Sequence, residues 1–350
     1  MHPTLAQWVK SCLHATVSAA EPLLVEASNR RFYRVRLAVS SSEPAAVGSV
    51  PTAPGSGPTD SSSGPAASSS RPGSFVVMES PPQLERNDAF VAVQKLLANN
   101  GQPVAPILAM DLERGFFLLG DLGERHLEDV YGGPLQDSAI ALAIDNLVAL
   151  QQIDAPDISP YLESRFRDEL GIFVEWFLGA LLGEPLPEAA ADAFEALIDN
   201  AVSQPRCLIH RDYHCRNLLV RQNGGLGIVD FQDALIGPAT YDLACLLWDC
   251  YHEFDDGDRR RWQRYYERRS RFSFPGGTLS ETLDLTGLQR QIKAIGIFAR
   301  LKLRDGKPAH LRYIVPVLQS AMRISLTYPG TVELGHLLKE VGARASRALH

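Results

Sequence analysis

Residues 208–220 read LIHRDYHCRNLLV, and residues 228–231 read IVDF. The first stretch contains a His-Arg-Asp triplet that ends at Asp212, and Asn217 follows five positions later. The second stretch places Asp230 directly after two β-branched residues, as at the end of a short buried strand. Two carboxylates and one amide can act together only if the segment between them brings them close in space.

That segment is predicted to be a β-hairpin. Residues 218–221 and 226–229 are β-prone runs, and residues 222–225 between them read QNGG, a strong turn signal. Asn217 comes just before the first strand and Asp230 just after the second. The hairpin therefore predicts that these two side chains lie next to each other.

The spacing is that of the catalytic loop of ATP-dependent phosphotransferases. Phosphoryl transfer needs a carboxylate that receives the proton of the acceptor hydroxyl, and oxygen ligands that hold Mg²⁺ against the phosphates. We therefore predict that Asp212 is the catalytic base, that Asn217 and Asp230 are metal ligands, and that ATP and Mg²⁺ are the cofactors. The alternative is a chance His-x-Asp match, and the agreement of spacing, hairpin and second aspartate argues against it.

Around this loop the chain resembles the aminoglycoside phosphotransferase and choline kinase superfamily, which shares the protein kinase fold and phosphorylates small molecules. His214 stands two positions after Asp212, where this superfamily commonly has His and protein kinases commonly have Lys. Residues 238–244 read PATYDLA, similar to the superfamily's Pro-x-x-Tyr-Asp-Leu-Ala helix start. The resemblance implies an α+β, two-lobed fold, with a small antiparallel β lobe plus one helix followed by a larger, mainly helical lobe.

More narrowly, the chain is similar to the bacterial kinases that phosphorylate N-acetylmuramate and N-acetylglucosamine at the anomeric hydroxyl during cell-wall recycling. The stretches that carry this resemblance are residues 27–35, 77–82, 172–178, 296–300 and 304–307. It implies transfer of the γ-phosphoryl group of ATP to a sugar hydroxyl. An aminoglycoside kinase, a kinase for a small alcohol such as choline or homoserine, and a non-catalytic nucleotide-binding module stay open as alternatives.

The nucleotide-binding part departs from the kinase pattern. The strand that usually carries a phosphate-binding Lys reads FVVME at residues 75–79, and the turn at residues 26–31 reads EASNRR, without glycine. We predict that Ser28, Asn29 and Arg30 in this turn contact the nucleotide.

Other cations are also candidates for replacing the missing Lys. Arg31 and Arg34 follow the same turn, and Arg216 lies four positions after Asp212, where it is predicted to meet the transferring phosphoryl group. The alternative for each of these residues is a solvated surface charge. Either Glu85 or Asp88 is the candidate for the helix carboxylate that usually pairs with the Lys.

The chain is predicted to divide into residues 1–122, a nucleotide-binding lobe, and residues 123–350, a catalytic and substrate-binding lobe. The resemblance implies an inter-lobe hinge at residues 116–123, FFLLGDLG, with Leu119 and Asp121 beside the adenine. Residues 40–74 are rich in Ser, Pro and Gly and nearly free of charge, so a disordered insert between two strands is predicted there.

Acceptor specificity is expected in the second lobe. Glu175 and Trp176 lie on a helix predicted over residues 161–182. A carboxylate can accept hydrogen bonds from sugar hydroxyls, and an aromatic face can pack on the apolar face of a sugar. The alternative is that Trp176 is ordinary core and Glu175 an exposed helix residue. His214 and Asp233 are further candidates because they are close to the reaction centre in sequence.

Composition limits the class of protein. The formal net charge of -7 argues against a nucleic-acid-binding protein, and five cysteines without metal-ligand spacing favour a reducing cytoplasm. Residues 1–19 predict an amphipathic helix rather than a signal peptide, and no transmembrane run is evident. A soluble cytoplasmic enzyme is expected, with ATP and a small sugar as its partners and without nucleic acid, membrane or an obligate protein partner.

Overall fold

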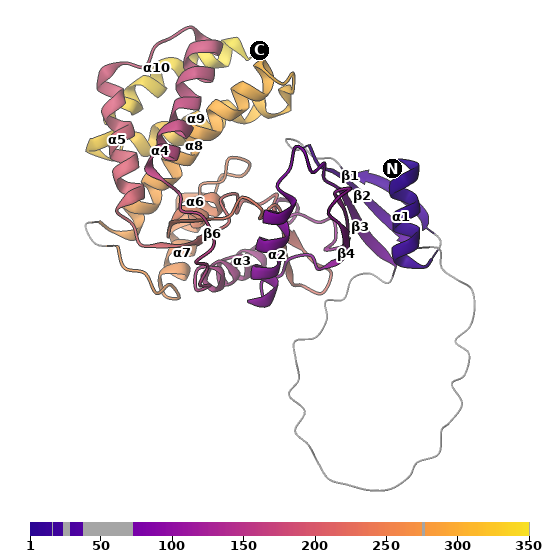
Figure 1. Ribbon diagram of the computed structural model, residues 1–350. Coiled ribbons are helices and arrows are strands. Elements are labelled where there is room, and N and C mark those ends of the chain that lie inside the picture. Colours follow the sequence, from indigo (N-terminus) through magenta and orange to yellow (C-terminus); the bar gives the residue numbers. More distant parts are fainter. Residues whose placement is uncertain (16, 24–28, 38–72, 275–276, 350) are drawn as a thin grey trace, which may run out of the picture. The chain divides into compact units, whose positions relative to one another are not determined.

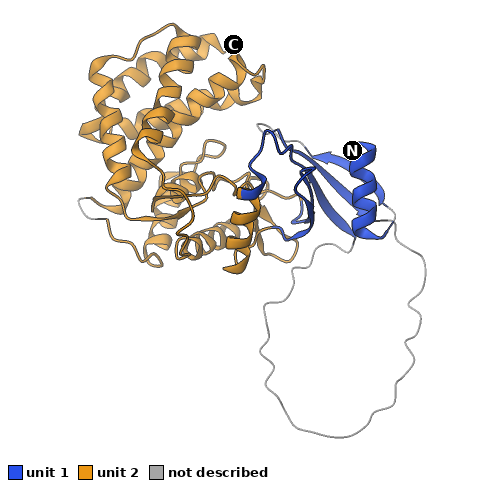
Figure 2. Cartoon of the chain, in the orientation of Figure 1, with its two compact units in different colours: residues 1–88, 105–123 blue, residues 89–104, 124–350 orange. Residues whose placement is uncertain are grey.

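The computed structural model describes residues 1–15, 17–23, 29–37, 73–274 and 277–349 (Figure 1). Ser28 and most of the insert predicted at residues 40–74 therefore lie outside the described residues. The chain separates into two compact units (Figure 2): unit 1 comprises residues 1–88 and 105–123, and unit 2 comprises residues 89–104 and 124–350. The lobe boundary predicted after residue 122 stays a prediction.

Unit 1 is built on a five-stranded antiparallel sheet in the order β1-β2-β3-β5-β4. Its strands are β1 (Val17–Leu23), β2 (Arg31–Leu37), β3 (Ser74–Glu79), β4 (Ile107–Asp111) and β5 (Phe116–Gly120). Helix α1 (Pro3–Leu13) lies on one face of this sheet. Its Leu5 and Val9 are fully buried in one core with Val35 and Val77 of the sheet, which is why the first residues fold as part of the unit.

The N-terminal helix is shorter than predicted. The sequence indicated a helix over residues 1–19, but α1 ends at Leu13, and His14 takes a left-handed backbone with a φ of 48°. Residues from Val17 onward pair with β2 instead. Strand pairing satisfies their backbone groups, so it overrides the local helical pattern.

Strands β2 and β3 flank the insert and pair directly, as the sequence predicted. Arg36 lies opposite Ser74, and the backbone N–H of Leu37 donates to the carbonyl of Gly73 at 2.8 Å. Apolar residues at helical spacing in residues 87–98 predict a helix, and α2 (Asn87–Asn99) confirms it. From Ala89 on, α2 belongs to unit 2. Asn87 anchors its first turn by donating from its side chain to the Ser80 carbonyl at 2.9 Å.

Unit 2 is mainly helical (Figure 1). Its helical elements are η1 (Leu127–Val130), α3 (Gln136–Leu150), α4 (Glu163–Ile172), η2 (Phe173–Leu182), α5 (Glu188–Val202), α6 (Tyr241–Leu247), α7 (Asp256–Glu267), α8 (Leu279–Leu303), η3 (Pro308–His310), α9 (Leu311–Ser325), η4 (Pro329–Thr331) and α10 (Val332–Ala348). The patterns of residues 138–152 and 187–202 predict helices, and α3 and α5 confirm them. The one predicted over residues 161–182 starts at Glu163 and widens into a π-helix at Phe173.

Helix α8 is the central element of unit 2, since it packs against α4, α5, α6, α9 and η2. Its N-terminus is capped by Thr278, whose hydroxyl accepts from the N–H of Glu281 at 3.2 Å. Gly296 lets the η2 backbone approach closely, because a Cβ at this position would lie 2.5 Å from the Phe173 nitrogen. A close contact between α8 and η2 therefore depends on a residue without a side chain.

Four short strands complete unit 2. The hairpin predicted around residues 222–225 is confirmed as β7 (Leu218–Val220) and β8 (Leu226–Ile228), with Gly224 at a φ of 79° in the turn. The antiparallel pair β6 (Arg206–Ile209) and β9 (Leu235–Pro238) was not predicted.

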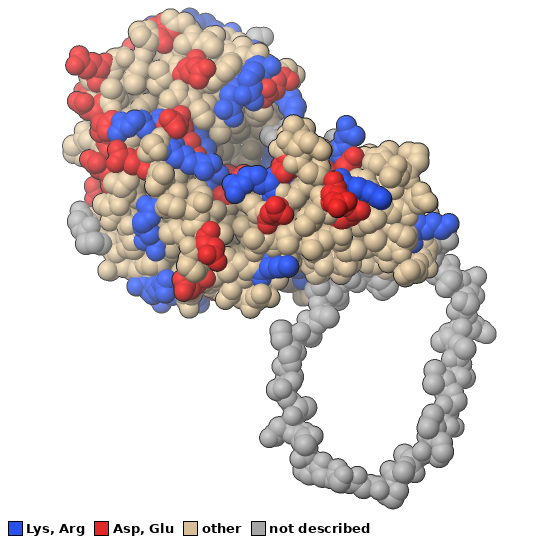
Figure 3. All heavy atoms as spheres, viewed as in Figure 1, with Lys and Arg blue, Asp and Glu red and all other residues tan. Residues whose placement is uncertain are grey.

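Two further features are the distribution of charge on the surface and the apolar character of the helices. On the face drawn in Figure 3, basic and acidic side chains are interspersed over unit 2 rather than gathered into a surface of one sign. No helix among the described residues has the length and apolar composition that crossing a bilayer requires.

Candidate active site

The loop between β6 and β7 carries the residues predicted to be catalytic, and α6 holds its backbone in place. Asp242, buried near the start of α6, accepts the backbone N–H of His210 at 2.6 Å and that of Arg211 at 2.9 Å. These bonds satisfy a backbone that turns sharply, since Arg211 has a φ of 78°. The PATYDLA stretch therefore supplies the anchor of the loop.

The His210 ring connects this loop to the end of β8. Its Nε2–H donates to the carbonyl of Val229 at 2.9 Å, and its Nδ1 accepts from the N–H of Asp212 at 3.3 Å. Asp230 follows directly, with a φ of 64°, so its side chain leaves the strand at a sharp turn. One neutral imidazole thus couples the backbone of Asp212 to that of the residue before Asp230.

Asn217 is oriented for ligation. Its side-chain N–H₂ donates to the Asp212 carbonyl at 2.9 Å, which leaves the amide oxygen as the group that can bind a cation. The backbone N–H of Val229 donates to the Asn217 carbonyl at 3.0 Å, which confirms that the hairpin brings the two segments together. The carboxylate of Asp230 is solvent-exposed and accepts from Gln232 at 2.7 Å. One carboxylate and one amide oxygen suit Mg²⁺, which binds proteins through few oxygens and completes its shell with phosphates and water.

Buried charges surround Asp212. Lys293 and Arg211 both contact the buried Glu169, at 3.0 and 3.1 Å, and Arg290 lies 3.7 Å from the Asp212 carboxylate. Burial alone would raise the pKa of Asp212, but the nearby Lys293 and Arg290 hold that pKa well below its ordinary value. The carboxylate is therefore ionised at neutral pH.

Glu169, Arg290 and Lys293 were not among the residues predicted from the sequence. The signal that could have found two of them is LQRQIKAIGIF at residues 288–298, because two cations interrupt an otherwise apolar helix there.

Arg216 takes protein partners. Its guanidinium donates to Glu128 at 3.1 Å and to the Tyr313 hydroxyl at 2.5 Å, and it lies 3.8 Å from the centroid of the Tyr251 ring. None of these contacts tests the role predicted for Arg216 at the phosphoryl group, which stays a prediction. His214 lies beside this cluster, with its ring edge-on to Tyr251 at 5.2 Å, and burial lowers its pKa.

In unit 1, the residues predicted for the nucleotide sit around Glu85. Asn29 donates to its carboxylate from backbone and side chain, both at 3.3 Å, and the buried Arg30 lies 3.5 Å from it. Arg30 also donates to Ser80 at 3.2 Å, whereas the Arg31 side chain is 72% exposed. Of the cations considered for the missing Lys, Arg30 is thus the one paired with a candidate for the helix carboxylate, whereas Arg34 pairs with Asp121.

Leu119 and Asp121 lie on β5 and just after it. Leu119 is buried and pairs with Val76 of β3. Asp121 accepts two hydrogen bonds from Arg34, at 2.8 and 3.2 Å, and one from Ser74 at 2.6 Å. The carboxylate of Asp121 is therefore engaged within unit 1.

The three remaining substrate candidates are not in contact with the loop. Within the described residues, no hydrogen bond, ion pair or ring contact links Glu175, Trp176 or Asp233 to the catalytic segment 210–217. Glu175 is exposed and Trp176 half-buried on η2, and Asp233 is exposed. Their roles in acceptor binding stay predictions.

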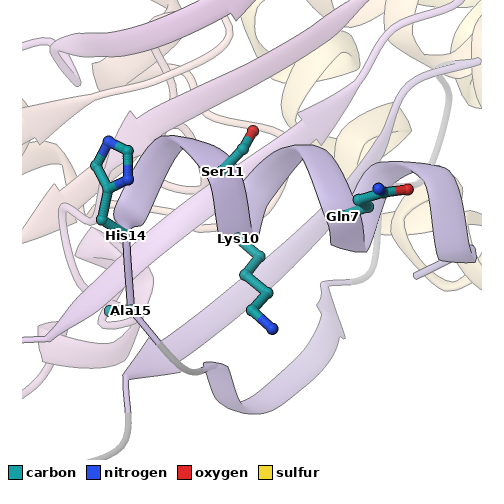
Figure 4. Close-up of a pocket in the computed structure, with 5 residues that line it drawn as sticks. All are labelled: Gln7, Lys10, Ser11, His14 and Ala15. Atoms are coloured by element: carbon teal, nitrogen blue, oxygen red, sulfur yellow. The ribbon is translucent and has the colours of Figure 1, made fainter.

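A surface pocket is present elsewhere, beside α1 (Figure 4). Gln7, Lys10, Ser11, His14 and Ala15 line it, and none of them belongs to the predicted catalytic or nucleotide-binding set.

Known proteins similar to this chain are phosphotransferases and kinases. Residues 66–276 match the model of the phosphotransferase enzyme family. An N-acetylmuramate/N-acetylglucosamine kinase of Pseudomonas putida is 38% identical over 285 residues, which cover 78% of this chain and 84% of the relative. The Neisseria meningitidis protein of the same name is 32% identical, over 77% of this chain and 84% of the relative.

Solved structures show the same fold at low sequence identity. An ADP-bound aminoglycoside phosphotransferase, APH(2'')-Ib, is 15% identical with a TM-score of 0.55, covering 93% of this chain and 99% of that one. A choline kinase from Streptococcus pneumoniae is 13% identical with a TM-score of 0.60, covering 93% and 98%. These likenesses confirm the predicted protein-kinase-like fold. The relatives named as kinases, together with the family model, show that the chain is a small-molecule kinase. The chain belongs to the phosphotransferase enzyme family.

Proposed function

We propose that this kinase transfers the γ-phosphoryl group of Mg-ATP to the anomeric hydroxyl of N-acetylmuramate or N-acetylglucosamine in cell-wall recycling. The observation that carries the chemistry is the hairpin that joins the Asp212 loop to the segment before Asp230. Relatives up to 38% identical and named for these two sugars support the acceptor. A location in the cytoplasm and activity without an obligate protein partner are part of the same proposal.

In this mechanism Asp212 orients the acceptor hydroxyl and receives its proton as the new O–P bond forms. The bond between the γ-phosphorus and the bridging oxygen breaks, and ADP leaves. Asn217 and Asp230 would hold Mg²⁺, which neutralises charge on the phosphates. An ionised Asp212 fits a reaction in which positioning supplies most of the acceleration and the proton moves late.

For the nucleotide, we propose that Arg30 and Asn29 contact the phosphates together with Ser28, and that the backbone near Leu119 and Asp121 contacts the adenine. Arg30 supports this assignment because it is held by Glu85 as the usual Lys is held by its glutamate. For the acceptor, His214 is the candidate with the most direct support, since its ring is in the catalytic loop and next to Tyr251. Asp233, Glu175 and Trp176 are proposed as further acceptor contacts.

The test is incubation of the purified protein with Mg-ATP and each sugar, following ADP release and the phosphorus NMR spectrum. We expect an anomeric phosphate with the wild type. Asp212→Ala should lower kcat by about 10³-fold or more, because it removes the group that orients the nucleophile, while nucleotide affinity is kept. Asp168→Ala is the matched control, since Asp168 is an exposed aspartate on α4. Unchanged turnover in Asp212→Ala would refute the assignment. Turnover only with an aminoglycoside or a small alcohol would change the acceptor class.

The metal ligands have a separate prediction. Asp230→Asn removes the charged ligand, so the affinity for Mg-ADP should fall at least about tenfold, while the weaker affinity for metal-free ADP should stay the same. Calorimetric titration with and without EDTA measures both affinities. Gln232→Ala is the control, because Gln232 contacts Asp230 and is not a proposed ligand. Equal loss of both affinities would mean that Asp230 supports the fold rather than the metal.

A further inference from the structure

Arg290 is a buried cation whose donors are not used. It lies on α8, and only 8% of its surface is exposed. Its Nε–H is buried without an acceptor, and its guanidinium makes no hydrogen bond to any residue in the described part of the chain. Its nearest charged neighbour is Asp212, at 3.7 Å, and the ring of Tyr241 lies 5.4 Å away. Buried donors normally have partners, so this group points to a ligand that is bound during the reaction.

The other cations around the loop are already paired. Lys293 and Arg211 share Glu169, and Arg216 donates to Glu128. Among the described residues, the one ion-pair partner of Arg290 is the catalytic carboxylate itself. The 3.7 Å separation is longer than a hydrogen bond, so this pair leaves the donors of Arg290 available.

The distances place the reacting groups within reach of Arg290. An acceptor hydroxyl would lie about 2.6–3.2 Å from Asp212, and the phosphorus about 3–3.5 Å beyond it. A guanidinium 3.7 Å from the same carboxylate can then reach an oxygen of the phosphoryl group with its free donors. We infer that Arg290 donates hydrogen bonds to the transferring phosphoryl group and so supplies positive charge beside Asp212, in addition to the charge that Arg30 is proposed to supply to the nucleotide phosphates.

The chemistry of the step is unchanged by this assignment. The acceptor oxygen forms its bond to phosphorus, the bond to the ADP oxygen breaks, and the proton moves to Asp212. The guanidinium of Arg290 is already in place and donates hydrogen bonds to the negatively charged phosphoryl oxygens. Such hydrogen bonds are strong in a buried site. The inference rests on the role proposed for Asp212 and not on the identity of the sugar.

The test compares Arg290→Lys and Arg290→Met with wild type, using both sugars. Arg290→Met should lower kcat about 10²-fold with each acceptor and leave both KM values nearly unchanged, as expected for a contact made mainly in the transition state. Arg290→Lys keeps the charge but not the planar fork, so an intermediate loss is expected. Arg304→Met, which changes a 55% exposed arginine at the end of the same helix, is the matched control and should behave as wild type.

A second measurement does not need a sugar. Mg-ADP with aluminium fluoride, and water in the acceptor's place, mimics the transferring group. Arg290→Met should weaken this complex by about the same factor as kcat and leave Mg-ADP affinity intact. Thermal unfolding of each variant shows whether it folds. If Arg290→Met does not fold, the comparison with wild type is made with Arg290→Lys.

Three outcomes would overturn the inference. If Arg290→Met lowers turnover with N-acetylmuramate alone, Arg290 binds the carboxylate of that sugar, because N-acetylglucosamine lacks this group. An increase in KM without a change in kcat, or a wild-type kcat in both variants, would leave Arg290 a structural partner of Asp212.

The proposed function has a different failure. If the wild-type protein phosphorylates neither sugar, the proposed acceptor is refuted, and the aluminium fluoride measurement still tests Arg290.

Discussion

Glu169 shows how a single buried side chain can connect the site to the fold. It lies on α4, accepts from Arg211 in the catalytic loop, and pairs with Lys293 on α8. The hydroxyl of Tyr161 also donates to it. A buried carboxylate with three such partners fixes the positions of three elements relative to one another, and removing it leaves cations without counter-charge.

Burial alone would raise the pKa of Glu169, but the Lys293 ammonium, the Tyr161 hydroxyl and the Arg211 guanidinium hold the pKa below its ordinary value. Because the folded-state pKa is depressed, the stabilisation is present above the unfolded value of about 4.3 and is lost as pH falls through the lower folded value. Glu169→Gln should therefore reduce the free energy of unfolding by about 3 kcal/mol at pH 7, as for a broken buried ion pair.

The measurement is urea unfolding of wild type and Glu169→Gln between pH 3 and 7. The difference between the two proteins should shrink as pH falls below about 4.3, because the carboxyl of the unfolded wild type is protonated there, and it should vanish as pH falls through the lower folded-state pKa. Glu195→Gln is the control: Glu195 pairs with Arg167 at the surface, and little change is expected at any pH. A difference that is independent of pH would show that packing rather than charge holds Glu169.

Site residues that come from distant helices are harder to predict from the sequence than those of the catalytic loop. Asp212, Asn217 and Asp230 lie within one short segment, so their spacing and the intervening turn identified them. Glu169, Lys293 and Arg290 meet the loop only through the packing of α4 and α8, and no local pattern records that packing.

At the scale of elements, local patterns predicted most helices and the central hairpin, because these depend on apolar periodicity and turn residues. The pair β6 and β9 was missed because each strand is only four residues long and finds its partner far away in the chain. The change from α4 to the π-helix η2 was also missed. The π-helix begins at Phe173, where the η2 backbone lies against Gly296. Its start therefore coincides with a tertiary contact, which local helix propensity does not predict.

Gly296→Ala tests that contact. The added Cβ would lie 2.5 Å from the Phe173 nitrogen and 2.7 Å from the Ile172 carbonyl carbon, and backbone cannot move aside as a flexible side chain can. We expect the free energy of unfolding to fall by about 3 kcal/mol, since α8 and η2 must separate.

The matched control is Gly342→Ala on α10, where a Cβ would meet nothing within 4 Å. There the substitution should stabilise by about 0.5–1 kcal/mol, because alanine is the better helix former. Chemical denaturation of both variants measures the two effects. Equal free energies of unfolding for the two variants would mean that η2 can move to accept the added Cβ without loss of stability.

At the scale of the whole molecule, the division into a β-rich and a helical part follows from the order of strand-like and helical patterns along the chain. The charges at the centre of the site do not follow from that order. Their geometry depends on which helices of unit 2 pack behind the catalytic loop, and α8, which supplies Arg290 and Lys293, is far from that loop in sequence.

The insert offers a test of how far the sheet of unit 1 depends on local chain connection. Leu37 and Gly73 are joined by a backbone hydrogen bond of 2.8 Å, and Arg36 pairs with Ser74, so β2 and β3 are already in register where the insert begins and ends. Replacing residues 38–72 by a four-residue turn containing Asn-Gly should leave kinase activity unchanged. It should also raise the free energy of unfolding by about 2 kcal/mol, because the closed loop is shortened by roughly three doublings.

The control replaces the same residues by a Gly/Ser segment of equal length, which should match wild type in both activity and stability. Urea unfolding and steady-state turnover are measured for the three proteins. Loss of activity in both variants would show that the insert's own residues take part in catalysis or binding. Loss of activity in the short-turn variant alone would show that catalysis requires a long connection between β2 and β3.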